Sequence, residues 1–204
     1  MDSKIAIIDY GVGNITSVAN SLNQISISNK IISNPYELDD YTHMILPGVG
    51  SFKSGMNGLK SGGWCDIIKN EVLVKKKRLL GICLGMQLLF DMGFENGETE
   101  GLGLISGVVN KMIVKTERLP HLGWNDLEIC DENFIFSSLP NHPDFYFAHS
   151  YHVLPEDKSS IIAYVNHGGK IVSVITKENI YGTQFHPEKS QENGMTLLSN
   201  FSNI

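Results

Sequence analysis

The chain has 204 residues, of which 42% are hydrophobic and 19% charged, which is the composition of one globular domain with a sizeable buried core. Its net charge of -6 argues against a broad basic surface for nucleic acid, and the basic run Lys75-Lys76-Lys77-Arg78 is interpreted as a solvated helix end. We find no signal segment and no apolar stretch of membrane-spanning length, so we expect a cytoplasmic protein without membrane contacts.

Strands and helices are predicted to alternate through the first half of the chain. Short apolar runs bounded by Gly or Pro indicate strands, and apolar residues three or four positions apart indicate helices. This alternation predicts a parallel sheet covered by helices. The predicted strands are 4–8, 30–32, 43–46 and 78–82, and the predicted helices are 14–22, 64–74 and 84–92.

Closely spaced β-like runs replace this alternation in the second half. They predict antiparallel hairpins, the clearest of which turns at Asn166-His167-Gly168-Gly169. The predicted strands of this half are 104–109, 111–114, 146–149, 161–165, 171–175 and 181–185.

A final helix is predicted over 194–201, with its apolar side chains packed inward. We therefore predict a single α/β domain over residues 1–204. Its sheet should be open, twisted and mostly parallel, flanked by helices, with additional antiparallel strands in the second half. The inward side chains of the final helix are Met195, Leu197, Leu198 and Phe201.

The three cysteines differ in their sequence context. Their number is odd and their spacing is not that of a metal site, so we expect neither a disulfide framework nor a bound metal. Cys65 and Cys130 are interpreted as ordinary thiols. Cys83 lies in Gly81-Ile82-Cys83-Leu84-Gly85, where an apolar strand gives way to a predicted helix.

This segment of the chain has the pattern of a nucleophile elbow with Cys in place of Ser. A sharp turn from strand to helix leaves no room for large neighbours, which explains Gly81 and Gly85, and it projects the Cys83 thiol above the sheet. The helix that starts at Leu84 would favour the thiolate through its dipole. The alternative is a buried core cysteine at the end of a strand.

A histidine and a glutamate near the C-terminus could activate this thiol. A cysteine nucleophile needs a base, and the base needs an acceptor on its other ring nitrogen. In Gln184-Phe185-His186-Pro187-Glu188, His186 and Glu188 are two residues apart and would face the same way in an extended segment. Cys83, His186 and Glu188 are thus the candidate catalytic residues.

A glycine-rich loop, Leu46-Pro47-Gly48-Val49-Gly50-Ser51-Phe52, leaves a predicted strand at the same edge of the sheet. Its backbone N–H groups could form an oxyanion hole together with the amide of Leu84. A tight β-to-α turn is the simpler interpretation. A phosphate-binding loop is unsupported because no Gly-Lys-Ser/Thr sequence follows.

Taken together, these segments resemble the class I (triad) glutamine amidotransferases, and within them the glutaminase subunits of imidazole glycerol phosphate synthase. The resemblance runs almost from end to end, with all segments in order. It is carried by the three segments quoted above and by Asp9-Tyr10-Gly11-Val12-Gly13-Asn14, Pro120-His121-Leu122-Gly123-Trp124-Asn125 and Lys189-Ser190.

This resemblance implies hydrolysis of L-glutamine, without a cofactor, by attack of Cys83 on the side-chain amide. It also implies a partner, a cyclase subunit of TIM-barrel fold that uses the ammonia to form imidazole glycerol phosphate in histidine synthesis. The implied oxyanion hole is Val49, Gly50 and Leu84; the implied glutamine-binding residues are Gly48, Gln87, Glu95, His149, Ser150 and Tyr151; and the implied interface and ammonia-exit residues are Asn14, Trp124, Tyr146 and Lys189.

Three alternatives remain open at the level of sequence. A paralogous glutaminase would supply ammonia for amidation of surface-polysaccharide sugars. A cysteine peptidase or γ-glutamyl hydrolase on a related fold would not explain the segment from Pro120 to Asn125. A binding module with a dead site would have no need of Cys83, His186 and Glu188 together.

Overall fold

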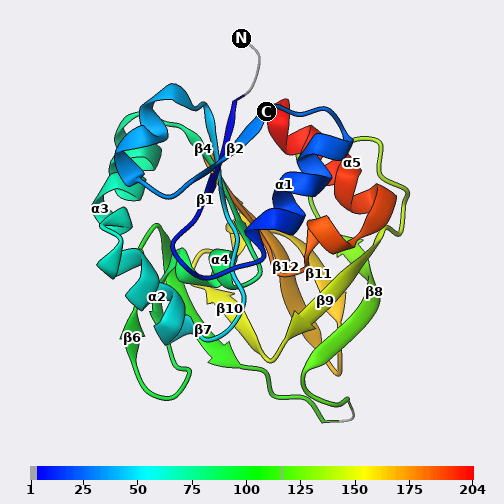
Figure 1. Cartoon of the computed structure of the whole chain (residues 1–204). Helices are drawn as coiled ribbons and strands as arrows, with labels where there is room; N and C mark the ends of the chain where they lie inside the picture. The colour runs from blue at the N-terminus through cyan, green and yellow to red at the C-terminus, as the bar shows by residue number, and fades with distance from the viewer. Residues whose placement is uncertain (1–3, 116) are drawn as a thin grey trace.

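A large mixed sheet forms the centre of the molecule in a computed structural model that describes residues 4–115 and 117–204 (Figure 1). Its strand order is β2-β1-β3-β4-β13-β12-β11-β8-β9. The strands from β2 to β13 in this order are parallel, and those from β13 to β9 pair antiparallel. The strands are β1 (Ile5–Ile8), β2 (Asn29–Ile32), β3 (His43–Leu46), β4 (Arg78–Ile82), β8 (His121–Ile129), β9 (Asp144–His149), β11 (Ile161–Asn166), β12 (Lys170–Lys177) and β13 (Ile180–Thr183).

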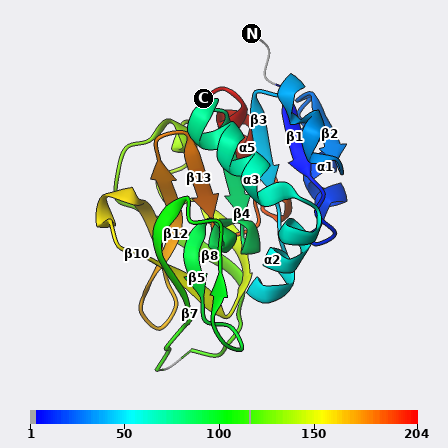
Figure 2. The same cartoon turned by 90° about the vertical axis from the view of Figure 1, so that its left-hand side faces the viewer.

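A second sheet of four strands, in the order β10-β7-β5-β6, lies beside the large one. Figure 2 shows β5 and β7 below α3, on the side of the molecule that also carries α2. Its strands are β5 (Phe90–Gly93), β6 (Thr99–Glu100), β7 (Ile105–Lys111) and β10 (Tyr151–Pro155).

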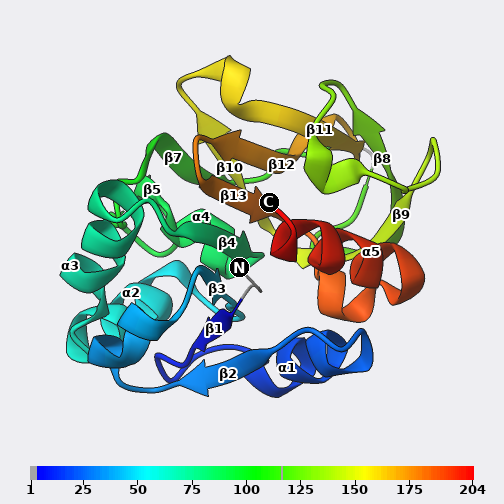
Figure 3. The same ribbon diagram turned by 90° about the horizontal axis from the view of Figure 1, so that it is seen from above.

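Helices cover both faces of the large sheet. Seen from above, α1 and α5 lie on one side, and α2 and α3 lie on the other (Figure 3). None of the helices in the described residues is both long enough and apolar enough to span a bilayer. The helices are α1 (Ile15–Gln24), α2 (Phe52–Ser61), α3 (Trp64–Lys69), α4 (Leu84–Leu88), α5 (Gln191–Ser202), the π-helix η2 (Asn70–Val74) and the 3-10 helices η1 (Pro35–Asp40), η3 (Phe134–Phe136), η4 (Lys158–Ser160) and η5 (Pro187–Lys189).

Two hydrophobic cores fill the space between these layers. Because successive side chains of a strand point to opposite faces, β1 contributes to both cores. Ala6 and Ile8 pack with α2 and α3, whereas Ile5 and Ile7 pack with α1 and α5. The parallel strands are therefore apolar on both faces, which explains why the sequence shows them as continuous apolar runs.

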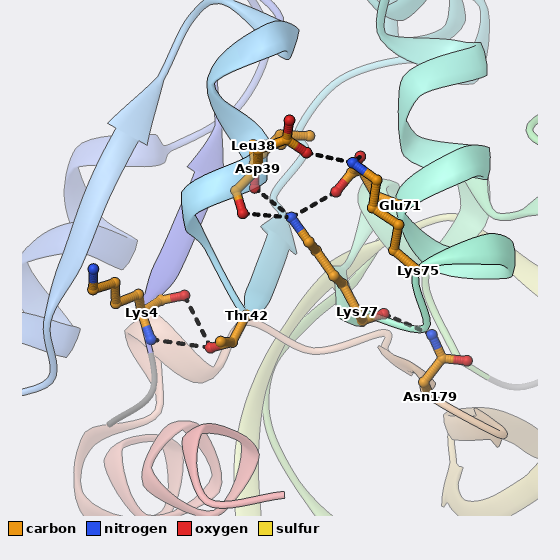
Figure 4. A network of polar contacts seen from close by, with 8 residues as sticks. All are labelled: Lys4, Leu38, Asp39, Thr42, Glu71, Lys75, Lys77 and Asn179. Carbon is orange, nitrogen blue, oxygen red and sulfur yellow. Dashed lines mark hydrogen bonds and ion pairs between the residues drawn. The ribbon is translucent and has the colours of Figure 1, made fainter. Parts of the chain in front are cut away.

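A polar network connects η1 with η2 and the basic run that follows it (Figure 4). Glu71 is buried and accepts ion pairs from Lys75 and Lys77, with N···O distances of 2.7 and 2.6 Å. Lys77 also donates to the carbonyl oxygens of Leu38 and Asp39. The basic run is thus only partly a solvated helix end, since Lys77 is held inside this network.

The predicted fold class and the strands 43–46 and 78–82 are confirmed, as is the hairpin at Asn166-His167-Gly168-Gly169. Of the four inward residues of α5, Met195 is only half-buried. The predicted helix 84–92 is wrong in its second half, because the carbonyl of Leu89 accepts hydrogen bonds from Leu104 and Ile105 and the chain continues as β5. The predicted strand 111–114 is also wrong, because β7 ends at Lys111.

Candidate active site

Cys83 occupies the turn between β4 and α4 in a strained backbone conformation. Its φ of 52° and ψ of -108° lie outside the regions that residues with a side chain favour. A Cβ on Gly85 would lie 1.8 Å from the Leu46 carbonyl oxygen, and one on Gly81 would lie 2.7 Å from the Met86 nitrogen. The elbow and the packing reason for its two glycines are therefore as predicted. The helix after it, α4, has only five residues.

His186 is brought beside the elbow by the pairing of β13 with β4. These strands are parallel, with Thr183 opposite Ile82, and the Cys83 N–H donates to the Thr183 carbonyl at 2.7 Å. Their carboxyl ends therefore meet at one edge of the sheet. His186 follows three residues after the last residue of β13.

The His186 ring is paired with Glu188 in the interior of the protein. The distance from Nδ1 of His186 to Oε1 of Glu188 is 2.8 Å, and both side chains are almost fully buried. The sequence predicted this contact from an extended segment, but Pro187–Lys189 form a 3-10 turn that folds the carboxylate back under the ring. The contact is thus confirmed and the expected backbone conformation is wrong.

Opposing effects act on the pKa of His186. Burial alone would lower this pKa, but hydrogen bonds and charge interactions with Cys83 and Glu188 outweigh it and raise the pKa to about 10. A protonated imidazole is therefore stable beside the sulfur.

The cysteine and the histidine face a cavity of about 540 Å³ at the carboxyl edge of the sheet. Its walls include most of the residues that the sequence predicted for catalysis and glutamine binding. They come from the glycine-rich loop, the elbow, β9 and the start of β10. The lining residues are Val49, Gly50, Ser51, Cys83, Leu84, Gln87, Glu95, Pro120, Ala148, His149, Ser150, Tyr151, His186 and Lys189.

Five predicted site residues lie outside this lining. Glu188 lies behind His186, and Gly48 is a buried residue within the glycine-rich loop. Trp124 and Tyr146 form an edge-to-face pair with ring centroids 6.1 Å apart, and the Lys189 amine lies 5.7 Å from the Tyr146 ring centre. The fifth residue, Asn14, precedes α1.

The glycine-rich loop is anchored by Tyr10, a residue that the sequence interpretation did not assign to the site. The Tyr10 hydroxyl donates to the Pro47 carbonyl at 2.8 Å, and a Cβ on Gly48 would lie 2.7 Å from that hydroxyl oxygen. Burial, followed by the charge of Cys83, raises the pKa of Tyr10. Within the described chain, the amides of Val49 and Gly50 have no hydrogen-bond acceptor, so both N–H groups are free to bind a ligand.

The carboxylate of Glu95 is held at the start of α2. Its Oε2 accepts a hydrogen bond from the Phe52 N–H at 2.8 Å. A carboxylate at this position interacts favourably with the helix dipole. Glu95 therefore joins the wall of the cavity to α2 and presents negative charge to a ligand.

Behind the cavity, two histidines form a chain of hydrogen bonds. Nδ1 of His149 is 2.8 Å from the Tyr151 carbonyl, Nδ1 of His121 is 3.2 Å from Nε2 of His149, and the Asn125 amide is 3.2 Å from Nε2 of His121. Burial lowers the pKa of His121 to about 4 and that of His149 to about 3. Both rings are therefore neutral at pH 7, and each donates through Nδ1–H.

Within the described residues, no group of three or more His, Cys, Asp or Glu side chains is placed to hold a metal ion. The three cysteines are all free thiols.

The geometry is that of an α/β enzyme that attacks its substrate through a cysteine. Comparison with known proteins specifies this class further. The family model for Glutamine amidotransferase class-I matches residues 6–203. The chain therefore belongs to the class-I glutamine amidotransferase family.

Within this family, two similar proteins are named as HisH subunits of imidazole glycerol phosphate synthase. The chain is 45% identical to "Imidazole glycerol phosphate synthase subunit HisH 1" of Campylobacter jejuni subsp. jejuni serotype O:23/36 (strain 81-176), with 98% of this chain and all of that protein covered. It is 42% identical to "Imidazole glycerol phosphate synthase subunit HisH" of Leptospira borgpetersenii, with the same coverage. A solved structure titled "Structure of PurLQS from Thermotoga maritima" matches with a TM-score of 0.76 and 19% identity over 100% of this chain and 99% of that one. This last likeness concerns the fold alone.

Proposed function

We propose that the chain is the glutaminase subunit of an imidazole glycerol phosphate synthase, with residues 1–204 as one amidotransferase domain in the cytoplasm. One observation carries the chemistry: Cys83, in a strained elbow, and His186, paired with Glu188, face the same cavity. The names of the relatives support the assignment to this synthase, and they do not favour the sugar-amidating alternative.

In the proposed first step, the Cys83 thiolate attacks the carbonyl carbon of the glutamine side-chain amide. A carbon–sulfur bond forms, and the carbonyl oxygen takes the negative charge. Protonated His186 then donates its proton to the amide nitrogen, the carbon–nitrogen bond breaks, and ammonia leaves a thioester on Cys83. Glu188 holds the ring so that Nε2 points to the reacting atoms.

A water molecule completes the proposed cycle. Neutral His186 takes a proton from the water as it attacks the thioester carbon, and the carbon–sulfur bond breaks. Glutamate leaves, and the thiolate–imidazolium pair is restored. The amides of Val49, Gly50 and Leu84 would stabilise the oxyanion in both steps, because backbone donors fixed in advance need no reorganisation.

Binding of L-glutamine is assigned to the remaining lining residues. The Glu95 carboxylate suits the α-ammonium group, and the backbone around His149, Ser150 and Tyr151 supplies polar contacts beside Gln87. The backbone of Gly48, which lies outside the lining, is assigned to glutamine binding as part of the glycine-rich loop. Both ring nitrogens of His149 already have partners in the protein. Its proposed role is therefore to shape the wall rather than to bind glutamine through its ring.

The proposed partner is a cyclase subunit of TIM-barrel fold, which would dock beside the cavity mouth. Residues directly opposite on antiparallel strands share a face. Leu122 pairs with Ala148, a wall residue, and Trp124 pairs with Tyr146 on the same face. Leu122 is 64% exposed and Trp124 is 44% exposed, so an apolar surface continues outward from the cavity. Asn14 and Lys189 are assigned to the same interface.

The test is the full chain assayed together with its cyclase subunit. Cys83→Ala should abolish turnover with glutamine, whereas added ammonium salt should still support the reaction of the cyclase. Loss of both activities would contradict a role limited to ammonia supply. In addition, a glutamine-like diazo ketone should label the Cys83 peptide in mass spectrometry, and absence of that adduct would overturn the glutaminase assignment.

A further inference from the structure

Gln184 contacts the nucleophile from inside the protein. It follows β13 directly and is completely buried, and its backbone N–H donates to the Ser173 carbonyl at 2.8 Å. The pairing of β13 with β4 places it next to Cys83. Its side-chain nitrogen Nε2 lies 3.7 Å from Sγ of Cys83, within hydrogen-bond distance for sulfur. Gln184 is separate from the cavity lining, so it reaches the sulfur without occupying substrate space.

The hydrogen-bond network determines which end of this amide faces the sulfur. Gln87 donates from Nε2 to the Tyr151 carbonyl at 3.1 Å, and a carbonyl can only accept. The Gln87 end that meets Gln184 is therefore the NH₂ group, which lies 3.1 Å from Oε1 of Gln184. With its oxygen toward Gln87, Gln184 must direct its own NH₂ group at Cys83. The reverse orientation would place two NH₂ groups against each other.

We propose that Gln184 is a positioning residue for Cys83, whose amide N–H fixes Sγ and stabilises the thiolate before substrate binds. This inference deepens the proposed function and rests on it for the reaction that the thiolate performs. A hydrogen bond to an ionised acceptor is stronger than one to a neutral acceptor, so the Gln184 amide favours the thiolate over the thiol. Cys83 in turn contributes to the raised pKa of His186, so the charge of a protonated His186 also acts on this sulfur.

The same arrangement limits what Gln87 can do for a ligand. Both hydrogens of its amide nitrogen are used, one by Tyr151 and one by Gln184. Its carbonyl oxygen is left to accept from a ligand in the cavity that Gln87 lines. Gln87 thus joins substrate binding to the position of the sulfur through a single intermediate side chain.

Alkylation of Cys83 by iodoacetamide measures this effect without requiring glutaminase activity. The full chain and its variants are alkylated over a range of pH, and the rate for each cysteine peptide is followed by mass spectrometry. Gln184→Met keeps the length of the side chain and removes the donor. Gln184→Glu keeps an oxygen toward Gln87 and places a second oxygen against the sulfur. Gln24→Met, the same exchange at an exposed position of α1, is the matched control.

At about pH 6, Gln184→Met should lower the alkylation rate of Cys83 about tenfold, as expected for loss of a hydrogen bond to a charged group. Gln184→Glu should lower it further. Rates at Cys65 and Cys130, and all rates in Gln24→Met, should stay as in the wild type. With glutamine as substrate, Gln184→Met should reduce kcat about tenfold with little change in KM.

Unchanged Cys83 alkylation in a folded Gln184→Met or Gln184→Glu variant overturns the inference, with folding judged by thermal unfolding. This outcome is distinct from failure of the proposed function. A wild-type chain without glutaminase activity, in which Cys83 alkylation still depends on Gln184, would refute the glutaminase assignment and leave the positioning role intact. An active chain whose Cys83 reacts alike in all variants would leave the glutaminase assignment intact and refute the positioning role of Gln184.

Discussion

At the scale of single residues, the elbow holds the reactive Cys83 in a strained backbone conformation that only close packing around it can maintain. The backbone of Cys83 is strained, and the chain packs so closely against Gly81 and Gly85 that neither position has room for a Cβ atom. We expect Gly85→Ala to be severely destabilising, by about 3 kcal/mol or more, because its Cβ would overlap the Leu46 carbonyl. Chemical denaturation measures this. Gly97→Ala, at an exposed turn with a φ of 108°, should show only the cost of its backbone conformation.

The carboxylate of Glu188 contacts the His186 ring, and its proposed role is to orient and charge that ring. We predict that Glu188→Gln lowers kcat for glutamine about 10²- to 10⁴-fold, because an amide can stabilise the wrong tautomer and does not stabilise the imidazolium. Steady-state kinetics with the cyclase present test this. Glu192→Gln, at the exposed start of α5, is the control. Equal activity of Glu188→Gln and wild type would remove Glu188 from the catalytic residues.

At the scale of elements, Tyr10 determines where the glycine-rich loop lies. Its hydroxyl joins the end of β1 to the Pro47 carbonyl across the buried side of the loop. Tyr10→Phe should cost about 1 kcal/mol of unfolding free energy and reduce kcat/KM for glutamine several-fold, since the loop amides lose their anchor. Tyr36→Phe, with a side chain that is 79% exposed, is the matched control. Unaltered kcat/KM in Tyr10→Phe would mean that the loop keeps its place without this hydrogen bond.

Histidines buried in the neutral form make stability depend on pH. Burial lowers the pKa of His43 and of His121 to about 4 and that of His149 to about 3. Below the unfolded pKa of about 6.5, the unfolded chain binds protons that the folded chain does not. The free energy of unfolding should therefore fall as pH decreases from about 6.5 to 4. The slope of this free energy against pH is proportional to the number of protons taken up on unfolding, which is up to one for each histidine. Urea unfolding at several pH values tests this, and His149→Gln should reduce the slope.

The elements also explain how far the sequence could predict this molecule. Short apolar runs bounded by Pro or Gly gave β3 and β4 correctly, because both faces of these strands are buried. The segment after Leu88 is equally apolar, and only distant hydrogen bonds from residues 102–105 make it a strand rather than a helix. β8 was not predicted, because only part of one of its faces is buried and its polar and glycine residues therefore give no clear alternation of apolar and polar positions.

The part of the candidate site that lies at the carboxyl ends of parallel strands could be predicted from the sequence. The contacts that side chains make across the packed interior could not. Cys83 directly follows β4 and His186 lies three residues beyond β13, so their meeting at one edge follows from the parallel pairing of these strands. Tyr10, Gln184 and His121 reach the site across the interior, and no spacing rule in the sequence indicates these contacts. The sequence carries Gln184 within a recognised segment, but its contact with the sulfur depends on the orientation of an amide that only the Gln87 network determines.

At the scale of the whole molecule, one face combines the cavity mouth with exposed apolar side chains. On this face, β8 and β9 extend outward from the cavity, with Leu122 and Trp124 beside Ala148 and Tyr146. Large exposed apolar side chains next to a cavity are typical of an interface that closes over it. Phe134, which is 54% exposed, lies in η3, which follows β8 in the chain and packs against α5.

This division predicts where the cyclase binds. Trp124→Ala should weaken binding of the cyclase subunit by about 2 kcal/mol, close to thirtyfold in Kd, because an aromatic anchor at the centre of an interface contributes most of its energy. Phe134→Ala should leave Kd unchanged. Isothermal titration of the two subunits measures both, and the rate of Cys83 alkylation in the isolated Trp124→Ala chain shows whether the site itself is intact. Equal effects of the two substitutions on Kd would place the interface elsewhere on the molecule.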